Sequence, residues 1–141
     1  MNQEINKKYE IKFRNEILKF KGFPATLTKN TYTISYTLMF FLDEWYSVDE
    51  IDEDLLPPLY DPTNDGTSSE TVGVYIKNGE ARLYSLIKPS SSPLNPDLVL
   101  PVIDLIEIIK NWREFLLQKP SNWIVLMCAI RNLYFNVRSE F

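Results

Sequence analysis

Carboxylates crowd the middle of this chain of 141 residues, and they are the side chains best suited to binding or catalysis. Between Lys29 and Lys77 there is no lysine or arginine, so residues 30–76 carry a formal charge of −10. Residues 1–29 are net +4 and residues 77–141 are net +2. Such a segment attracts a positively charged partner and repels nucleic acid and anionic lipid. The charge pattern therefore predicts a basic partner that is not DNA, RNA or a membrane.

Carboxylates are also common metal ligands and catalytic acids. Residues 61–66 begin like a calcium-binding loop, with glycine at the sixth position. The third position is Thr63, however, and the twelfth is Val72, where a bidentate glutamate is needed. Glycoside hydrolysis needs two carboxylates at a fixed separation across a cleft, and crowding in sequence does not indicate one. We therefore expect no metal and no cofactor.

Histidine is absent from the chain, which removes the commonest general base and a usual transition-metal ligand. This composition excludes Ser-His-Asp triads, Cys-His dyads and histidine-based zinc sites. Cys128 is the single cysteine, and it lies in an apolar run that predicts an inert core position. We expect the protein not to be an enzyme.

Apolar and aromatic residues are threaded through the acidic segment, as in protein interfaces, where such residues act as anchors. A solvated loop that aids solubility is the main alternative, and a metal or catalytic site is a further one. We predict an interface with a protein partner. The predicted partner-binding residues are Asp43, Glu44, Trp45, Tyr46, Asp49, Glu50, Asp52, Glu53, Asp54, Tyr60, Asp61 and Asp65.

The rest of the composition is that of a globular protein, with 45% hydrophobic and 24% charged residues. The length predicts a single domain over residues 1–141. One cysteine fits a reducing compartment, and the polar N-terminus shows no secretory pattern. No apolar run is long enough to cross a bilayer. We expect a soluble cytoplasmic protein without a membrane partner.

The N-terminal half gives two periodic patterns and one segment without a period. Ile5, Tyr9, Phe13, Ile17 and Phe20 recur at helical spacing, which predicts an amphipathic helix over about residues 3–20. Apolar and polar residues alternate over residues 31–40, which favours a strand, although a buried helix running through residues 41–42 is the alternative. Residues 43–71 are rich in turn residues, so we expect an acidic loop.

The C-terminal half carries the clearest local signal. Asn78-Gly79 lies between two apolar runs and predicts an antiparallel hairpin over residues 72–87. A short strand over residues 98–100 is one interpretation, and a helix over residues 101–118 follows. A last helix is predicted over residues 122–137, with a final strand as the alternative. The predicted fold is α+β, with a small antiparallel sheet covered by amphipathic helices.

Residues 100–116, LPVIDLIEIIKNWREFL, resemble a segment of immunity proteins from bacterial polymorphic and contact-dependent toxin systems. In those proteins a short strand leads into an amphipathic helix that ends in Trp-x-x-Phe-Leu. The resemblance implies a cytoplasmic inhibitor that masks a cognate toxin, often a nuclease. It transfers no contact residues. The alternative is a phage or bacterial adaptor or inhibitor of another system, also without catalysis.

Overall fold

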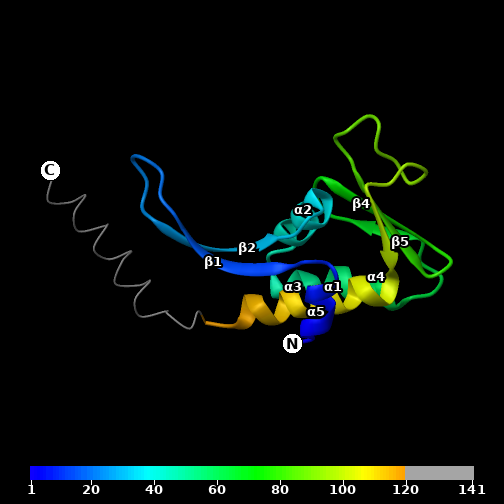
Figure 1. The fold of residues 1–141 in the computed structure, drawn as a ribbon, viewed down its shortest axis with the longest axis horizontal. Helices are drawn as coiled ribbons and strands as arrows, with labels where there is room; N and C mark the ends of the chain where they lie inside the picture. Colours follow the sequence, from blue (N-terminus) through cyan, green and yellow to red (C-terminus); the bar gives the residue numbers. More distant parts are fainter. Residues whose placement is uncertain (120–141) are drawn as a thin grey trace, which may run out of the picture.

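The structure is a computed structural model that describes residues 1–119. The helix predicted over residues 122–137 and Cys128 lie outside the described residues. The described part has an α+β fold, as predicted, with a four-stranded and a two-stranded antiparallel sheet. Figure 1 shows the larger sheet at one end, the two-stranded hairpin projecting at the other, and helix α5 (Val102–Leu117) running between them.

The larger sheet is built around the predicted hairpin of β4 (Val72–Lys77) and β5 (Glu80–Ser85). Asn78 and Gly79 have φ angles of 55° and 75°, as a two-residue turn of this kind requires. β3 (Gly66–Ser68) and β6 (Leu98–Pro101) flank the hairpin, giving the order β3-β4-β5-β6. The predicted hairpin and the short strand before α5 are both confirmed.

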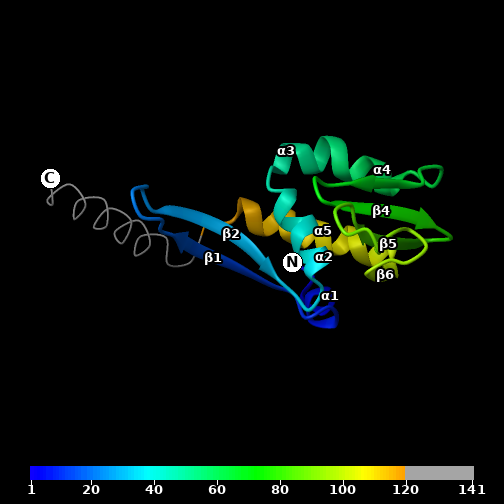
Figure 2. The ribbon, with the colours of Figure 1, turned by 90° about the horizontal axis from the view of Figure 1, so that it is seen from above.

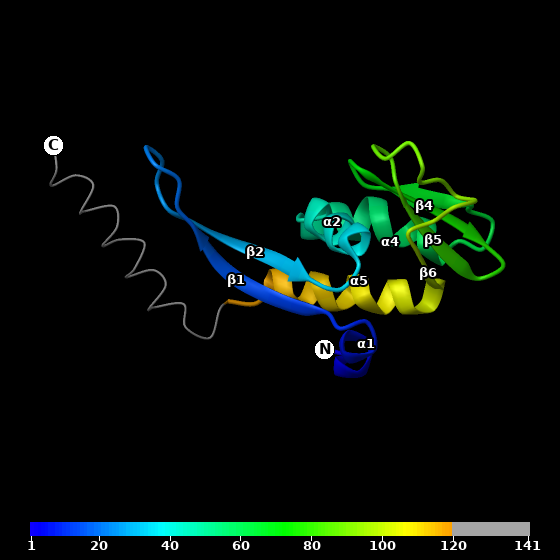
Figure 3. The same ribbon diagram turned by 45° about the horizontal axis from the view of Figure 1, so that its top comes forward.

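Helix α5 confirms the helix predicted over residues 101–118, and the core packs against one side of it. Its apolar side is buried along its length, with Leu105, Ile108, Ile109 and Trp112 fully inaccessible to solvent. Figure 3 shows α5 extending from β6 to the base of the projecting hairpin. This one helix therefore connects the two sheets of the protein.

The helix predicted over residues 3–20 is wrong. α1 (Gln3–Lys8) stops after six residues, and the chain reverses at Glu10, which has a φ of 52°. β1 (Lys12–Leu18) follows and pairs along its whole length with β2 (Thr26–Tyr32). Pairing with the threonine-rich strand β2 favours a strand over the helix that the local spacing predicts, because β-branched residues pack well in a sheet.

The strand predicted over residues 31–40 is also wrong, and the alternative helix is present. β2 ends at Tyr32, and α2 (Tyr36–Glu44) begins after Ser35, whose hydroxyl accepts a hydrogen bond from the Leu38 amide at 3.2 Å. In the helix Leu38, Phe41 and Leu42 become fully buried while Tyr36 and Phe40 face solvent. Helical geometry buries these three side chains together, whereas a strand would separate them.

The N-terminus is fastened to α5 by a polar cluster. The Asn2 amide donates to the Asn111 side chain at 2.9 Å. The Asn111 side-chain amide in turn donates to the Asn2 carbonyl at 2.7 Å and to the Asn6 side chain at 2.9 Å. The terminal ammonium lies 3.3 Å from Glu114. Residues from the first and last parts of the described chain therefore meet on one helix.

Candidate partner-binding surface

The acidic segment is largely helical, which corrects the prediction of a loop over residues 43–71. α3 (Val48–Glu50), a π-helical turn η1 (Ile51–Leu55) and α4 (Leu56–Tyr60) form one continuous helical run over residues 48–60. Its start is capped by the Ser47 hydroxyl, which accepts from the Glu50 amide at 3.4 Å. Figure 2 shows this run along one flank of the molecule, beside α5 and the larger sheet.

Two prolines directly follow the irregular turn inside this run. Pro57 and Pro58 have no N–H, so they cannot donate to the carbonyls four residues earlier. In the turn just before the prolines, the Leu56 amide donates to the Ile51 carbonyl, five residues earlier. This wider spacing makes the turn π-helical. Three consecutive carboxylates, Asp52 to Asp54, stand on this wide turn, and all three are exposed.

The inner side of the run is apolar and packs into the core. Ile51 and Leu55 are fully buried, and Leu56 and Leu59 are 9% and 5% exposed. These four are among the apolar residues of the acidic segment that the sequence analysis predicts to be anchors for a partner, and the structure places them inside the protein instead. Their burial fixes the backbone of the run, so the points from which the outer charged side chains project are defined.

Arg113 of α5 neutralises one of these carboxylates. Its guanidinium donates two hydrogen bonds to Asp52, one of them 2.7 Å from Nη2 to Oδ2. This pair lowers the pKa of Asp52 and raises that of Arg113. Sequence reasoning missed Arg113, because nothing in the local pattern of α5 indicates which carboxylate it meets.

Four exposed carboxylates of the run make no hydrogen bond or ion pair within residues 1–119. We call these four residues, Asp49, Glu50, Glu53 and Asp54, the acidic face. Tyr46 precedes the run and is 73% exposed, and Tyr60 ends it and is 55% exposed. Lys110 lies 5.9 Å from the centre of the Tyr60 ring. The acidic face is thus bordered along the chain by two accessible aromatic side chains.

Three of the predicted partner-binding residues make hydrogen bonds that hold elements of the fold together. Asp43 accepts a hydrogen bond from the Thr31 amide at 2.9 Å, which joins α2 to β2. Glu44 accepts from the hydroxyls of Ser69 and Thr71 and from the Thr71 amide. The Trp45 carbonyl accepts from the indole N–H of Trp112 at 2.9 Å.

Asp61 and Asp65 lie after the helical run and are exposed. Asp61 accepts hydrogen bonds from the amide and hydroxyl of Thr63, at 2.9 and 2.7 Å, which closes a tight turn. These bonds lower the pKa of Asp61. The Asp65 carbonyl accepts from the Ile76 amide and so ties the turn to β4. These two residues shape the connection to the sheet.

Asp43 and Glu44 are adjacent but respond to pH in opposite directions. Burial raises the pKa of Asp43 despite its bond to Thr31. Burial would also raise the pKa of Glu44, but the hydrogen bonds from Ser69 and Thr71 outweigh it and lower that pKa. The Glu44 contribution to stability is therefore complete above its ordinary value of 4.5 and is lost as pH falls through the lowered pKa. The Asp43 carboxylate destabilises the fold as pH rises through its raised pKa.

This difference predicts opposite effects of two neutralising substitutions. Glu44→Gln is expected to lower the free energy of unfolding at neutral pH by about 1–2 kcal/mol and to flatten the loss of stability below about pH 4.5. Asp43→Asn keeps an acceptor oxygen for Thr31 and is expected to preserve or increase stability at neutral pH. Urea unfolding from about pH 3 to about pH 7 measures both. Equal destabilisation by the two substitutions would contradict the assignment.

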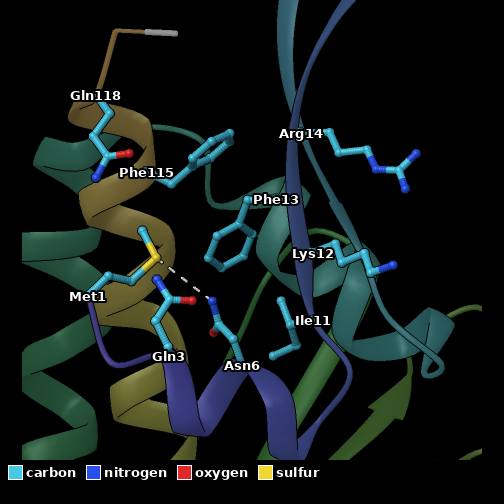
Figure 4. A pocket seen from close by; sticks show the side chains of 9 residues that line it. All are labelled: Met1, Gln3, Asn6, Ile11, Lys12, Phe13, Arg14, Phe115 and Gln118. Atoms are coloured by element: carbon cyan, nitrogen blue, oxygen red, sulfur yellow. Dashed lines mark hydrogen bonds between the residues drawn. The ribbon is translucent and has the colours of Figure 1, made fainter. Parts of the chain in front are cut away.

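Two cavities of the described residues lie away from the acidic face. One of about 470 Å³ lies between α1, β1 and the end of α5, and Figure 4 shows Phe13 and Phe115 on its walls. Its lining contains no carboxylate, cysteine, serine or threonine. A second cavity, of about 410 Å³, lies at the start of α2 and includes Asp97 and Lys88. Neither cavity contains a residue that was predicted to bind a partner.

Within residues 1–119, no group of three or more Asp, Glu or Cys side chains is arranged to hold a metal ion. No helix in this part of the chain is long and apolar enough to cross a membrane. Comparison of the chain with protein-family models, with curated proteins and with solved structures finds no match.

Proposed function

We propose that this protein is a non-catalytic inhibitor that binds a basic protein partner through the acidic face. The observation that carries the proposal is the placement of four exposed carboxylates, without an ion-pair partner among residues 1–119, on a helical run that is anchored by buried aliphatic residues. The charges occupy neighbouring positions, and their field adds up in the direction of an approaching partner.

Anchoring matters because a flexible acidic loop would lose conformational entropy when it binds. Residues 48–60 are already helical, and Ile51 and Leu55 hold them against the core. A preformed surface avoids most of this cost, so more of the interaction energy appears as affinity. The structure of the acidic segment thus supports a binding surface better than a solubilising loop.

The surface also offers contacts that are not ionic. Tyr46 and Tyr60 are exposed at the two ends of the helical run. Tyrosine side chains provide large contact areas and are frequent at the energetic centre of interfaces. Carboxylates would speed the encounter with the partner, and the aromatic contacts would slow its release.

The partner class that best fits this surface is a nuclease toxin. A nuclease needs a basic groove for the phosphates of its substrate, and a row of carboxylates can occupy such a groove. The resemblance of residues 100–116 to immunity proteins points the same way. We therefore infer an immunity protein that acts in the cytoplasm against a cognate toxin.

Co-expression tests the immunity role. If the neighbouring gene encodes a large secreted protein with a basic C-terminal domain, that domain is the toxin to use, produced under an inducible promoter. Cells that also produce this chain are expected to grow after induction, whereas cells with empty vector are not. Growth arrest despite soluble production of the chain would exclude immunity against that domain.

A further inference from the structure

The cavity of about 410 Å³ at the start of α2 has the size of a small-molecule site, because such sites usually measure about 300–1,000 Å³. Its lining comes from the end of α1, the start of α2, the loop between β5 and β6, and the start of β6. Figure 2 shows α1, α2 and β6 close to one another. We call this cavity the α2 cleft. No residue of the acidic face lines it, so it is a separate candidate site.

Part of the α2 cleft is apolar. Leu38, which is fully buried in the core, and the half-buried Leu98 both contribute to its lining. Ile34 and Tyr36 line it as well, and they are 77% and 73% exposed. Covering apolar surface of this kind with a ligand is favourable, because it removes that surface from water. The lining therefore fits an apolar side chain of a ligand.

Two opposite charges share this lining. Lys88 and Asp97 are both exposed, and neither forms an ion pair within residues 1–119. One oxygen of Asp97 accepts a hydrogen bond from the Thr37 hydroxyl at 2.8 Å, and its other oxygen accepts none from the described residues. Single charges on a surface are usual, but here a cation and an anion without charged partners line one cavity beside apolar side chains. Such a site fits a ligand that carries both charges.

We propose that the α2 cleft binds a small zwitterion with one apolar side chain, which is the chemistry of a free apolar amino acid such as leucine. The ligand ammonium pairs with Asp97, the ligand carboxylate pairs with Lys88, and the ligand side chain covers Leu38 and Leu98. A simple amine or a simple acid would leave one of the two charged groups of the cleft unpaired. This inference does not depend on the acidic face or on a toxin partner.

The two charged groups differ in their freedom to move. The Thr37 hydroxyl holds the Asp97 carboxylate beside α2, and Thr37 itself is only 8% exposed. Lys88 has a long, flexible side chain, so its ammonium can follow the ligand carboxylate. Asp97 therefore fixes the position of the ligand, whereas Lys88 adjusts to it. Since ordering the lysine costs conformational entropy, loss of Asp97 is expected to weaken binding at least as much as loss of Lys88.

Titration of the full-length protein with L-leucine tests the proposal, with amide chemical shifts in NMR spectra as the readout. We expect the largest shifts in residues 33–38, in Lys88 and in residues 97–98. The dissociation constant is expected to lie in the millimolar range or below, as so small a ligand allows. Absence of shifts in these residues at about 20 mM leucine overturns the proposal, and so do equally large shifts spread over other surfaces.

Three analogues of leucine separate its charges from its apolar side chain. Isopentylamine lacks the carboxylate, 4-methylpentanoate lacks the ammonium, and N-acetyl-leucinamide keeps the side chain without either charge. Each analogue is expected to bind at least about tenfold more weakly than leucine, because it leaves one or both charged groups of the cleft unpaired. An analogue that binds as tightly as leucine would show that the missing charge is not recognised, and the proposal would be rejected.

Matched substitutions locate the two charges. Asp97→Asn keeps an acceptor oxygen for Thr37, and this variant and Lys88→Gln are each expected to bind leucine about tenfold more weakly or worse. Lys77→Gln and Glu80→Gln change exposed residues outside the cleft and are expected to leave leucine binding unchanged. The amide spectrum of each variant also shows whether it is folded. Equal leucine affinity in all four variants contradicts the proposal, and that result would leave toxin binding by the acidic face unaffected.

Discussion

Reversing the acidic face, by Asp49→Lys, Glu50→Lys, Glu53→Lys and Asp54→Lys together, is expected to weaken binding of the basic partner by about 100-fold or more. Most of the change should appear in the association rate, because these charges act on the encounter before contact. The affinity of the reversed variant should also depend less steeply on salt. Surface plasmon resonance with the purified toxin domain at several salt concentrations measures affinity, rate and salt dependence.

The chain offers a control with the same change in net charge. Glu4, Glu10, Glu70 and Glu80 are exposed, unpaired within residues 1–119, and outside the helical run. Reversing these four is expected to change affinity by less than about tenfold, since only long-range repulsion remains. If both variants bind equally, net charge and not the acidic face explains the attraction. Unchanged binding of the first variant would reject the surface altogether.

Replacing Trp112 by alanine is expected to lower the free energy of unfolding by about 3–5 kcal/mol. The side chain is fully buried and contacts the rings of Phe13 and Phe115. Its indole N–H also satisfies the Trp45 carbonyl, at the point where the chain turns from α2 toward the acidic face. Since domains of this size are stable by only about 5–15 kcal/mol, this substitution would remove a large fraction of the total stability.

Two further substitutions separate the causes of this loss. Trp112→Phe retains an aromatic ring but leaves the Trp45 carbonyl without this donor, and it is expected to cost about 1–3 kcal/mol. Ile103→Ala lies on the same helix at a position that is 72% exposed, and it should change stability by less than about 0.5 kcal/mol. Urea unfolding followed by circular dichroism gives all three values. A similar cost for Ile103→Ala and Trp112→Ala would contradict the assignment of Trp112 to the core.

The sequence predicts correctly those elements whose causes are local. Asn78-Gly79 sets the β4–β5 turn by its own backbone preference, and one apolar side of α5 is visible in its spacing. The prediction of a helix over residues 3–20 is wrong because β1 depends on a partner strand, and no local pattern encodes the position of that strand. The prediction of a strand is wrong over residues 36–44 because tyrosine, leucine and phenylalanine fit both a strand and a helix. The Ser35 cap and packing in the core together favour the helix.

The residues of the candidate surface also differ in how far the sequence alone predicts their positions. Asp49, Glu50, Glu53 and Asp54 are exposed, as charged residues usually are, so their positions on the surface follow from residue type. Asp43 and Glu44 have equally polar side chains, but their partners are the Thr31 amide and the Ser69–Thr71 turn. Those partners approach only in the folded chain. The sequence therefore predicts the charge of the surface but not which carboxylates are used for folding.

The attachment of the N-terminus to α5 has a consequence for synthesis on the ribosome. Asn2 and Phe13 find their partners at Asn111 and Trp112, so nearly the whole described chain must emerge before these contacts form. Native contacts that are distant in sequence slow folding, and apolar surface exposed meanwhile favours aggregation. Phe13 would remain uncovered during translation, beside Phe20 and Phe23, which are exposed in the folded structure as well. The N-terminal hairpin is therefore the segment of the nascent chain on which chaperones are expected to act.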